Sequence, residues 1–194
     1  MSATGSSPRL TAFVQAIERL VERTQDEAAL LGEGSRLLAA LVATDDWLPD
    51  AYARPNPDRY SQYLLHRDPD DRFSLVSFVW GPGQATPVHD HTVWGLVGVL
   101  RGAELAQSYA IDNGGVRALG PPYRLAAGEV EAVSPTVGDV HKVWNAYDDR
   151  VSISIHLYGA DIGKVSRHTF NEAGEPKTFI SGYSTPALQH SSAA

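Results

Sequence analysis

The chain has 194 residues, of which 43% are hydrophobic and 20% are charged, so it is long enough for one domain with a substantial core. Its formal net charge of −7 at pH 7 argues against nucleic acid and against an anionic membrane as partners, because both would repel it at long range. The sequence contains no cysteine, which excludes disulfides and thiolate metal ligands and leaves histidine or carboxylate groups to hold any metal.

The N-terminal part of the chain is expected to be helical. Residues 1–8 predict a disordered start, and apolar residues then recur at helical spacing over residues 10–21. A second helix is expected over about residues 26–42, with interruptions at Gly32 and Gly34.

After a connecting loop at residues 45–57, the sequence changes to short apolar or alternating runs separated by Gly, Pro and Asp. Many short strands at this spacing predict an antiparallel barrel or sandwich. The candidate strands are residues 60–65, 73–80, 88–100, 103–111, 123–125, 129–133, 139–144 and 151–158.

We see no long-period repeat and no linker, so we expect a single domain over residues 9–184. Its N-terminal helices, at about residues 9–43, should pack outside the barrel, and residues 185–194 should form a mobile tail. The first nine residues lack the apolar core of a signal peptide, and no apolar run approaches transmembrane length. We therefore expect a cytoplasmic protein whose oligomeric state the sequence leaves open.

His89 and His91 form an H-x-H pair inside one of the expected strands. Side chains of a strand alternate between its faces, so both imidazoles should point to one side, close enough to share a metal, while Asp90 and Thr92 point to the other. The alternative is that the two histidines lie on a solvated sheet face.

The residues around this pair resemble the motifs of the cupin family. Gly83, the H-x-H pair, Gly95 and Gly102 have the spacing of the first cupin motif, in which the position of Gly95 is a glutamate. A second set of residues resembles the second cupin motif: Gly128, Pro135, Gly138, His141 and Asn145. The resemblance implies a mainly β, jelly-roll-like double-stranded β-helix, with His89, His91 and His141 as metal ligands; a degenerate cupin without metal is the alternative.

Without the glutamate, three neutral imidazoles would leave the full charge of a divalent metal uncompensated. Up to three coordination positions would stay open for substrate and oxygen. The same ligand set could also hold zinc with an activated water, as in a hydrolase or isomerase.

Residues 151–158, VSISIHLY, alternate strictly between apolar and polar side chains. Ser154, His156 and Tyr158 therefore share one face. If that face points into the barrel, a hydroxyl, an imidazole and a phenol can form a hydrogen-bonded row that directs the Tyr158 hydroxyl toward the metal. The alternative is an edge strand with this face in water.

The pattern S-x-H-x-Y after the third histidine, together with H-x-H and no cupin glutamate, resembles the cysteine dioxygenase family of thiol dioxygenases. The resemblance spans roughly residues 60–184. It implies that the three histidines bind iron(II), that a substrate thiolate binds the iron, and that O2 is added to sulfur to give a sulfinate. It also implies that Ser154, His156 and Tyr158 support the site.

One departure from that family is informative. The chain has no cysteine, so Tyr158 cannot carry the cysteine–tyrosine cross-link of mammalian members. The segment HDHTVWGLVGVLRGAE, with Gly95, is similar to the bacterial 3-mercaptopropionate dioxygenase branch. That branch has a glutamine and a later arginine near the substrate carboxylate, positions that match Gln62 and Arg167 here.

We therefore expect an enzyme that uses iron(II) and O2 to oxidise a small thiol carboxylate. 3-Mercaptopropionate is the favoured substrate and cysteine the alternative, and Tyr158 would contact either the carboxylate or the oxygen. No G-x-G-x-x-G or P-loop pattern suggests an organic cofactor. The rivals from other classes are an iron cupin that cleaves C–C bonds and a non-enzymatic cupin that binds a small ligand.

Overall fold

A computed structural model describes residues 7–186 of the chain. Most of the residues for which we expected disorder or a mobile tail, 1–6 and 187–194, lie outside the described residues, as does His190. Within the described part, the chain forms two α-helices, one short 3-10 helix and twelve β-strands, which confirms the expectation of a mainly β fold. None of these helices is long and apolar enough to cross a membrane.

Both helices begin at side-chain caps. Helix α1, Pro8–Arg23, starts inside the segment expected to be disordered, because Ser7 Oγ accepts a hydrogen bond (3.2 Å) from the backbone of the first turn and proline is well suited to the first helical position. Helix α2, Glu27–Val42, is capped by Asp26, whose carboxylate accepts a backbone hydrogen bond of 2.9 Å. The apolar side of each helix is buried, as its periodicity predicts.

Helix α2 runs without a break through Gly32 and Gly34, so the expected interruption is wrong. The physical reason lies in packing. A Cβ atom at Gly34 would lie 2.7 Å from Leu96 Cδ1, whereas one at Gly32 would meet nothing within 4 Å. Gly34 thus lets the helix approach the sheet closely, and tertiary packing stabilises the helix against the entropic cost of glycine.

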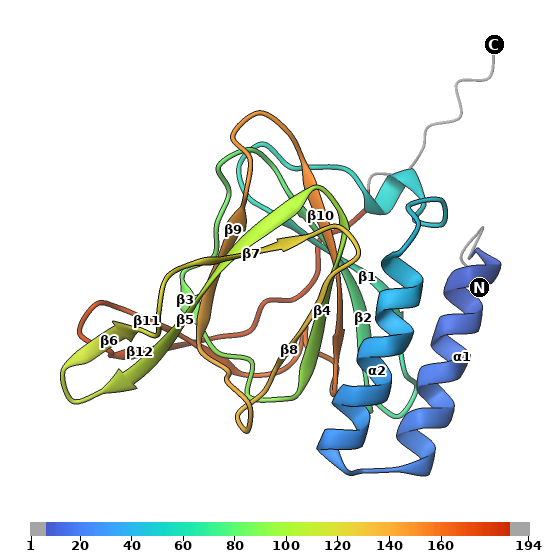
Figure 1. Cartoon of the computed structure of the whole chain (residues 1–194), viewed down its shortest axis with the longest axis horizontal. Coiled ribbons are helices and arrows are strands. Elements are labelled where there is room, and N and C mark those ends of the chain that lie inside the picture. Colours follow the sequence, from blue (N-terminus) through green and yellow to red (C-terminus); the bar gives the residue numbers. More distant parts are fainter. Residues whose placement is uncertain (1–6, 187–194) are drawn as a thin grey trace.

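The strands form two antiparallel sheets (Figure 1). The five-stranded sheet has the order β1 (Ser61–Arg67), β2 (Ser74–Trp80), β10 (Ser152–Tyr158), β4 (Gly95–Arg101) and β8 (Val130–Val133). The seven-stranded sheet has the order β12 (Pro176–Phe179), β11 (Arg167–Phe170), β3 (Val88–His89), β9 (His141–Asn145), β5 (Ala103–Asp112) and β6 (Gly115–Ala118), and β7 (Tyr123–Ala126) also pairs with β5.

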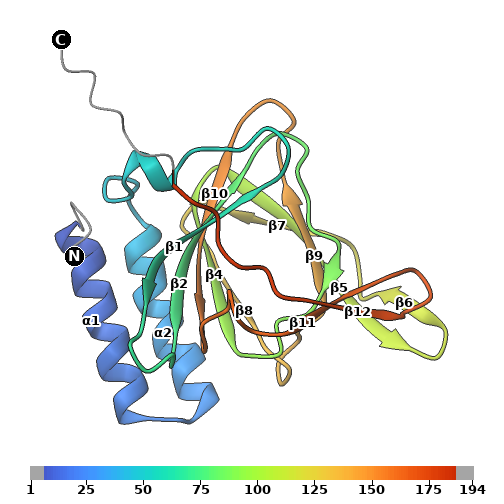
Figure 2. The same cartoon turned by 180° about the vertical axis from the view of Figure 1, so that it is seen from behind.

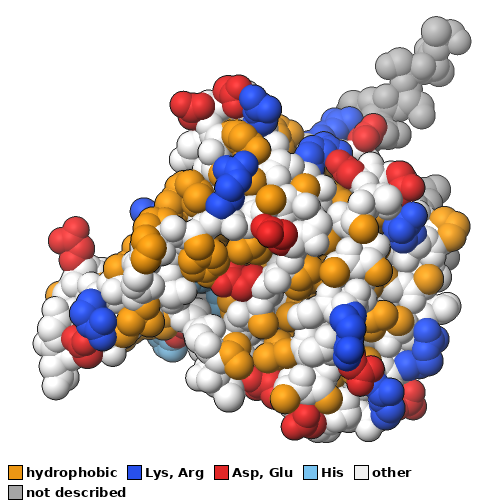
Figure 3. Space-filling view, in the orientation of Figure 1, with side chains coloured by type: hydrophobic (Ala, Val, Ile, Leu, Met, Phe, Trp, Pro, Cys, Tyr) orange, Lys and Arg blue, Asp and Glu red, His pale blue; other side chains and the backbone are white. Residues whose placement is uncertain are grey.

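The two sheets face each other and make a barrel, and both helices cover the outer face of the five-stranded sheet, with α2 packed against β4 and β8 (Figures 1 and 2). This is the cupin-type, jelly-roll-like barrel with external helices that the sequence predicts. The 3-10 helix η1, Asp50–Tyr52, lies in the expected connecting loop. In the view of Figure 3, acidic and basic side chains are interspersed, and no single sign of charge dominates the described part of that face.

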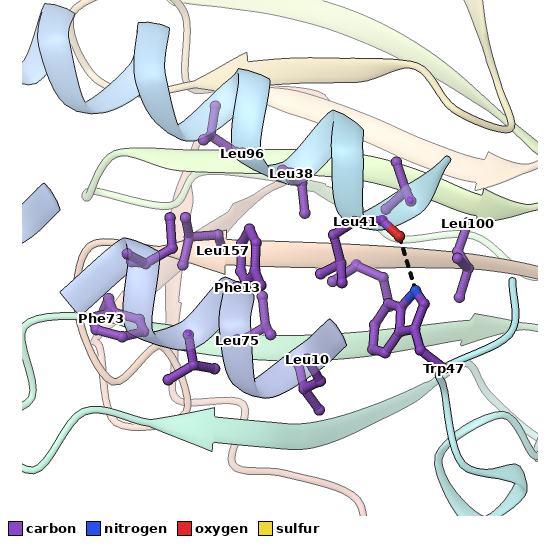
Figure 4. Close-up of a cluster of buried hydrophobic side chains, with 14 of the residues drawn as sticks. Leu10, Phe13, Leu38, Leu41, Trp47, Phe73, Leu75, Leu96, Leu100 and Leu157 are labelled. Atoms are coloured by element: carbon purple, nitrogen blue, oxygen red, sulfur yellow. Dashed lines mark hydrogen bonds between the residues drawn. The ribbon is translucent and has the colours of Figure 1, made fainter. Parts of the chain in front are cut away.

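Two separate apolar clusters fill the molecule. One lies between the helices and the five-stranded sheet and includes Phe13, Leu38 and Leu157; there Trp47 Nε1 donates a hydrogen bond (2.9 Å) to the Leu41 carbonyl (Figure 4). The other lies inside the barrel and includes Phe78, Trp80, Val143 and Tyr158. The second cluster borders the cavity described below.

The structure differs from the expected strands in two respects. The run at residues 88–100 is not one strand, because the chain turns between β3 and β4, where Thr92 has a positive φ of 61°. Strands β6, β11 and β12 were not predicted from the sequence. Each has only four residues, too few to show a hydrophobic alternation, and most of their side chains are exposed or half-buried.

Candidate metal centre and its cavity

The three histidines of the two motifs converge inside the barrel. His89 is in β3 and lies directly opposite His141 of β9, while His91 follows His89 by two residues and so returns to the same side. One potential ligand atom from each of the three rings lies within 4.8 Å of the others, and all three side chains are buried. The expected convergence of these rings is therefore present.

Hydrogen bonds to the other ring nitrogen orient two of these imidazoles. His89 Nδ1 lies 3.1 Å from the Pro87 carbonyl, and His91 Nδ1 lies 3.0 Å from Asp139 Oδ1. A carbonyl or carboxylate oxygen can only accept here, so each Nδ1 carries the proton and each Nε2 keeps its lone pair. Such outer hydrogen bonds are typical of metal-binding histidines, and the Asp139 carboxylate also accepts the backbone N–H groups of His91 and Thr92.

The electrostatics of the cluster fit a cation. Burial, with a smaller effect of the neighbouring His91, lowers the pKa of His89 to about 3. Burial together with the other histidines lowers the pKa of His141 well below its usual range. Both rings are therefore neutral at physiological pH, which is the form that donates a lone pair to a metal. A set of neutral nitrogen donors suits a divalent transition metal such as iron or zinc.

Gly95 stands where the motif that this segment resembles has a glutamate, and its surroundings explain why no carboxylate ligand fits there. A Cβ atom at Gly95 would lie 2.8 Å from the Tyr158 ring. A glutamate at this position would collide with the phenol, so the space of the missing ligand is taken by Tyr158.

Ser154, His156 and Tyr158 form the hydrogen-bonded row that the alternation predicts. Ser154 Oγ lies 2.7 Å from His156 Nε2, and His156 Nδ1 lies 2.8 Å from the Tyr158 hydroxyl. Strand β10 is paired on both sides, with β2 and β4, so the alternative of an edge strand in water is wrong. Burial is the largest effect on the pKa of Tyr158 and raises it, while burial lowers that of His156, so both side chains are uncharged at neutral pH.

His156 and Tyr158 of the row and the three histidines line one cavity of about 150 Å³. Aromatic rings supply much of the rest of its wall, with Phe78, Trp80 and Tyr158 contributed by the apolar cluster inside the barrel. Its other lining residues are Tyr60, Gln62, Thr86, Pro87, Val143, Arg167, Thr169, Phe179 and Ser181.

Arg167 and Gln62, both expected near the substrate, line this cavity. Arg167 is 3% exposed, and its guanidinium lies over the Phe179 ring at 4.7 Å. Its Nη2 donates to Ser181 Oγ at 2.7 Å, its Nε has no hydrogen-bond partner, and no carboxylate among the described residues is within ion-pairing distance of it. A buried guanidinium without a counter-ion at a cavity wall fits an anionic ligand.

Gln62, which also lines the cavity, uses its side-chain amide for hydrogen bonds within the protein. Gln62 Nε2 already donates to Ser181 Oγ (2.8 Å) and to the Gly182 carbonyl (2.6 Å). Both amide protons are thus engaged, and Gln62 holds the C-terminal segment beside Arg167. That segment crosses from β12 to β1 in Figure 2, and Ser184 hydrogen-bonds the Gln62 backbone.

Sequence reasoning assigned no role to four residues that shape the site: Asp139, Phe179, Ser181 and Tyr60. Asp139 lies two residues before His141, and its carboxylate is the only local signal that could have marked it. The other described histidines lie apart from the cluster. His66 stacks on Phe73, and His168 Nδ1 is 2.8 Å from Asp90 Oδ2, on the side away from the metal ligands as the alternation predicts.

Comparison with known proteins identifies relatives at the level of family and of fold. A family model described as cysteine dioxygenase type I matches residues 1–171. Among solved structures, a cupin-like protein from Thermotoga maritima is 19% identical over 71% of this chain and 90% of that chain, with a TM-score of 0.45. An uncharacterized protein with a double-stranded β-helix domain from Klebsiella pneumoniae is 19% identical over 69% and 96%, with a TM-score of 0.44. A cupin superfamily protein from Desulfitobacterium hafniense is 14% identical over 61% and 94%, with a TM-score of 0.44.

Proposed function

The chain belongs to the cysteine dioxygenase type I family, and on that premise we propose that it is a non-haem iron(II) thiol dioxygenase. Its substrate is a small thiol carboxylate, with 3-mercaptopropionate favoured, and its product is the sulfinate. One observation carries the proposal: three buried imidazoles and a buried arginine that has no counter-ion among residues 7–186 face the same cavity of about 150 Å³.

Iron(II) would be held by His89, His91 and His141. When bound, it supplies Lewis acidity toward a thiolate and the redox chemistry that joins O2 to sulfur. Asp139 and the Pro87 carbonyl keep two of the rings in the tautomer that leaves Nε2 free. The sulfur provides all four electrons for the reduction of O2, so the reaction R–S⁻ + O2 → R–SO2⁻ balances without a reductant or an organic cofactor.

Arg167 is the partner for the substrate carboxylate. Its guanidinium stacks on the Phe179 ring, and its Nη2 donates a hydrogen bond to Ser181. Further N–H groups of the guanidinium remain for a bidentate contact with a carboxylate. Because the arginine is buried, its charge is poorly screened and favours an anion strongly. Ser181 accepts from Arg167 and from Gln62, so its own hydroxyl proton is free to donate to the same carboxylate.

The lining of the cavity favours 3-mercaptopropionate over cysteine. The two compounds differ by one amino group, and none of the described residues that line the cavity is Asp or Glu. An ammonium group would therefore lie near Arg167 without an anionic partner, which costs free energy in a buried site. The small cavity volume and the aromatic walls also favour a compact ligand.

Tyr158 is placed to assist the reaction as a neutral hydrogen-bond donor. Its ring stacks on His91, with 5.6 Å between ring centroids, and its hydroxyl is held by His156. The raised pKa of Tyr158 keeps the phenol protonated at neutral pH. A proton held there can bond to the carboxylate or to oxygen added to the sulfur.

The test is a substrate panel on protein reconstituted with iron(II) under nitrogen. Oxygen uptake and the mass of the product are measured with 3-mercaptopropionate, cysteine, cysteamine and a diketone. We expect one O2 consumed per thiol, the highest kcat/KM for 3-mercaptopropionate, and a product heavier by two oxygen atoms.

The same panel separates the rivals. Uptake with the diketone alone would identify a C–C bond-cleaving cupin, and full iron loading with no uptake on any thiol would reject the proposal. Protein that takes up no metal would indicate a ligand-binding cupin, and a zinc-loaded protein indifferent to oxygen would indicate a hydrolase or isomerase.

A further inference from the structure

Strand β5 places a buried carboxyl group, Glu104, inside the barrel. Glu104 is 2% exposed, and it shares its side of the strand with Ala106, a member of the apolar cluster inside the barrel. Its Oε1 has no hydrogen-bond partner, and no cation among residues 7–186 forms an ion pair with it. Burial of a carboxylate without a counter-ion costs free energy, which favours the protonated, neutral form of the group.

The groups that face the Glu104 carboxyl are the Ser154 hydroxyl and the Trp80 indole, both of which lower its pKa. Ser154 is the first member of the row that leads through His156 to Tyr158. Glu104 therefore lies at the end of the row opposite the cavity. Trp80 and Ser154, which are hydrogen-bonded to each other, are thus the groups through which Glu104 can act on the row.

The protons of the row can be counted. Trp80 Nε1 is only a donor, and it donates to Ser154 Oγ at 3.2 Å. The remaining capacity of Ser154 is one O–H to donate and one lone pair to accept. His156 is neutral because burial lowers its pKa, so it carries a single ring proton. The position of that proton fixes the direction of every hydrogen bond in the row.

With Glu104 protonated, its O–H can donate to Ser154, Ser154 donates to His156 Nε2, and His156 Nδ1–H donates to the Tyr158 oxygen. The phenol proton of Tyr158 is then free to point into the cavity. This arrangement pairs every donor with an acceptor between the Glu104 O–H and the Tyr158 oxygen.

With Glu104 ionised, the direction reverses. The carboxylate accepts the Ser154 O–H, and Ser154 accepts from His156 Nε2–H. His156 Nδ1 then accepts the phenol proton, and Tyr158 offers only a lone pair to the cavity. The Tyr158 hydroxyl thus presents either a donor or an acceptor to the cavity. Which of the two it presents depends on whether Glu104, at the other end of the row, carries its proton.

The surroundings of Glu104 place this change near neutral pH. Burial raises the pKa of Glu104 to about 7, and the carboxyl of Glu131 on β8 adds a further increase. Glu131 is hydrogen-bonded to Tyr123 on β7, and the other titratable group that interacts with Glu104 is Tyr158 on β10.

We propose that Glu104 is a positioning residue that sets the tautomer of His156 and thereby decides whether Tyr158 donates to, or accepts from, the ligand in the cavity. The protonated form of Glu104 is the active one, because only it leaves the Tyr158 proton for a carboxylate or for oxygen on sulfur. The catalytic part of this inference rests on the proposed function, whereas the tautomer change does not.

The first test uses the full-length chain freed of metal by a chelator and labelled with ¹⁵N at histidine. The ¹⁵N shifts of His156, assigned by comparison with His156→Gln, distinguish the two tautomers. We expect Nδ1–H below the pKa of Glu104 and Nε2–H above it. A single tautomer at every pH at which the protein stays folded would overturn the proposal, and this measurement needs no Glu104 variant.

The variants give the matched comparison. Glu104→Gln keeps the shape of the side chain but cannot ionise, so the tautomer of His156 should no longer depend on pH. Glu131→Gln removes the neighbouring carboxyl and should keep the transition, moved to lower pH. If Glu104→Gln folds and keeps the wild-type transition, another group controls His156 and the proposal is wrong.

The second test is the pH profile of thiol oxidation by the iron(II) form. The kcat should fall by about tenfold per pH unit above the pKa of Glu104, and Glu104→Gln should flatten that limb without a comparable change in KM. An unchanged limb in the variant would overturn the catalytic role of Glu104. Iron-loaded protein that oxidises no thiol would reject the proposed function and leave the tautomer result standing.

Discussion

Four histidines in and around this barrel differ in the hydrogen-bond partners of their ring nitrogens. The Nδ1 groups of His89 and His91 are bonded to oxygen acceptors, which leaves Nε2 for a metal. Both nitrogens of His156 are used within the row, so it has no free lone pair for a metal. His168 is bonded to Asp90 and joins β11 to the segment that carries the ligands. The partner of the second ring nitrogen thus distinguishes a ligand from a relay.

Replacement of His141 tests the ligand set. His141→Ala leaves two imidazoles, and two nitrogen ligands are too few to retain a divalent metal after dialysis. We expect the iron content, measured by elemental analysis after reconstitution, to fall from about one per chain to a small fraction. His66→Ala, at a histidine that stacks on Phe73 away from the cluster, is the control and should bind iron normally. Stoichiometric iron in the His141 variant would show that this assignment is wrong.

Replacement of Arg167 tests the carboxylate contact. Arg167→Ala removes a charge-assisted, bidentate contact, so we expect KM for 3-mercaptopropionate to rise by about 10- to 100-fold, corresponding to roughly 1.5–3 kcal/mol. KM for cysteamine, which has no carboxylate, should change little. Arg124→Ala, an exposed arginine outside the cavity, is the control. Equal increases for both thiols would rule out the clamp.

At the scale of elements, the local sequence predicts most of the helices and strands but not where they are interrupted. The glycines of α2 suggest a break that does not occur, and the apolar run at residues 88–100 hides a real one at Thr92. In both places a tertiary contact overrides local propensity. Leu96 of the sheet fills the space at Gly34, and the Asp139 carboxylate accepts the backbone N–H of Thr92 in the turn.

The two glycines of α2 offer a matched prediction. Gly32→Ala should stabilise the protein by about 0.5–1 kcal/mol, because alanine has the higher helix propensity and the added methyl group meets no atom within 4 Å. Gly34→Ala gains the same propensity but forces Leu96 to move, and overpacking costs about 1–3 kcal/mol.

Urea denaturation of the two variants measures this difference. The free energy of unfolding of Gly34→Ala should lie below that of Gly32→Ala by about the overpacking cost of 1–3 kcal/mol. Equal stabilisation of both would mean that α2 is not held against β4 in the way described.

At the scale of the whole molecule, two apolar clusters on either side of the five-stranded sheet have separate roles. The outer cluster joins the helices to the sheet, and the inner cluster borders the cavity. Strand β10 serves both, since Ile153, Ile155 and Leu157 face outward and Ser154 and His156 face inward. The helical layer therefore supports the strand that carries the row without contributing a residue to the cavity.

This separation predicts that stability and site geometry respond differently to substitution. Leu38→Ala in the outer cluster should lower the free energy of unfolding by about 2–5 kcal/mol while iron stoichiometry and KM stay close to wild type. Val76→Ala in the inner cluster, directly opposite His156, should lower both stability and kcat. Chemical denaturation and steady-state oxygen uptake on the same preparations check both; a large change in KM for Leu38→Ala would contradict the separation.

The cavity also depends on the segment after β12, whose position the local sequence does not predict. The segment after β12 brings Ser181 to Gln62 and Arg167, although Gln62 and Ser181 are 119 residues apart. The family model ends at residue 171, so Phe179 and Ser181 lie beyond the matched residues and still form part of the wall.

The sequence by itself determined the barrel with its outer helices, the three histidines and the order of Ser154, His156 and Tyr158. The shared side of His89 and His91 and the row follow from the pleat of a strand, which dictates which side chains share a face, whereas the type of barrel and the choice of His141 came from the resemblance to family motifs. Only the tertiary structure decided that Asp139 orients His91, that Ser181 stands between Gln62 and Arg167, and that Glu104 faces Ser154. Those contacts join residues far apart in the chain or on different strands, so they depend on strand order and sheet packing, which no local period encodes.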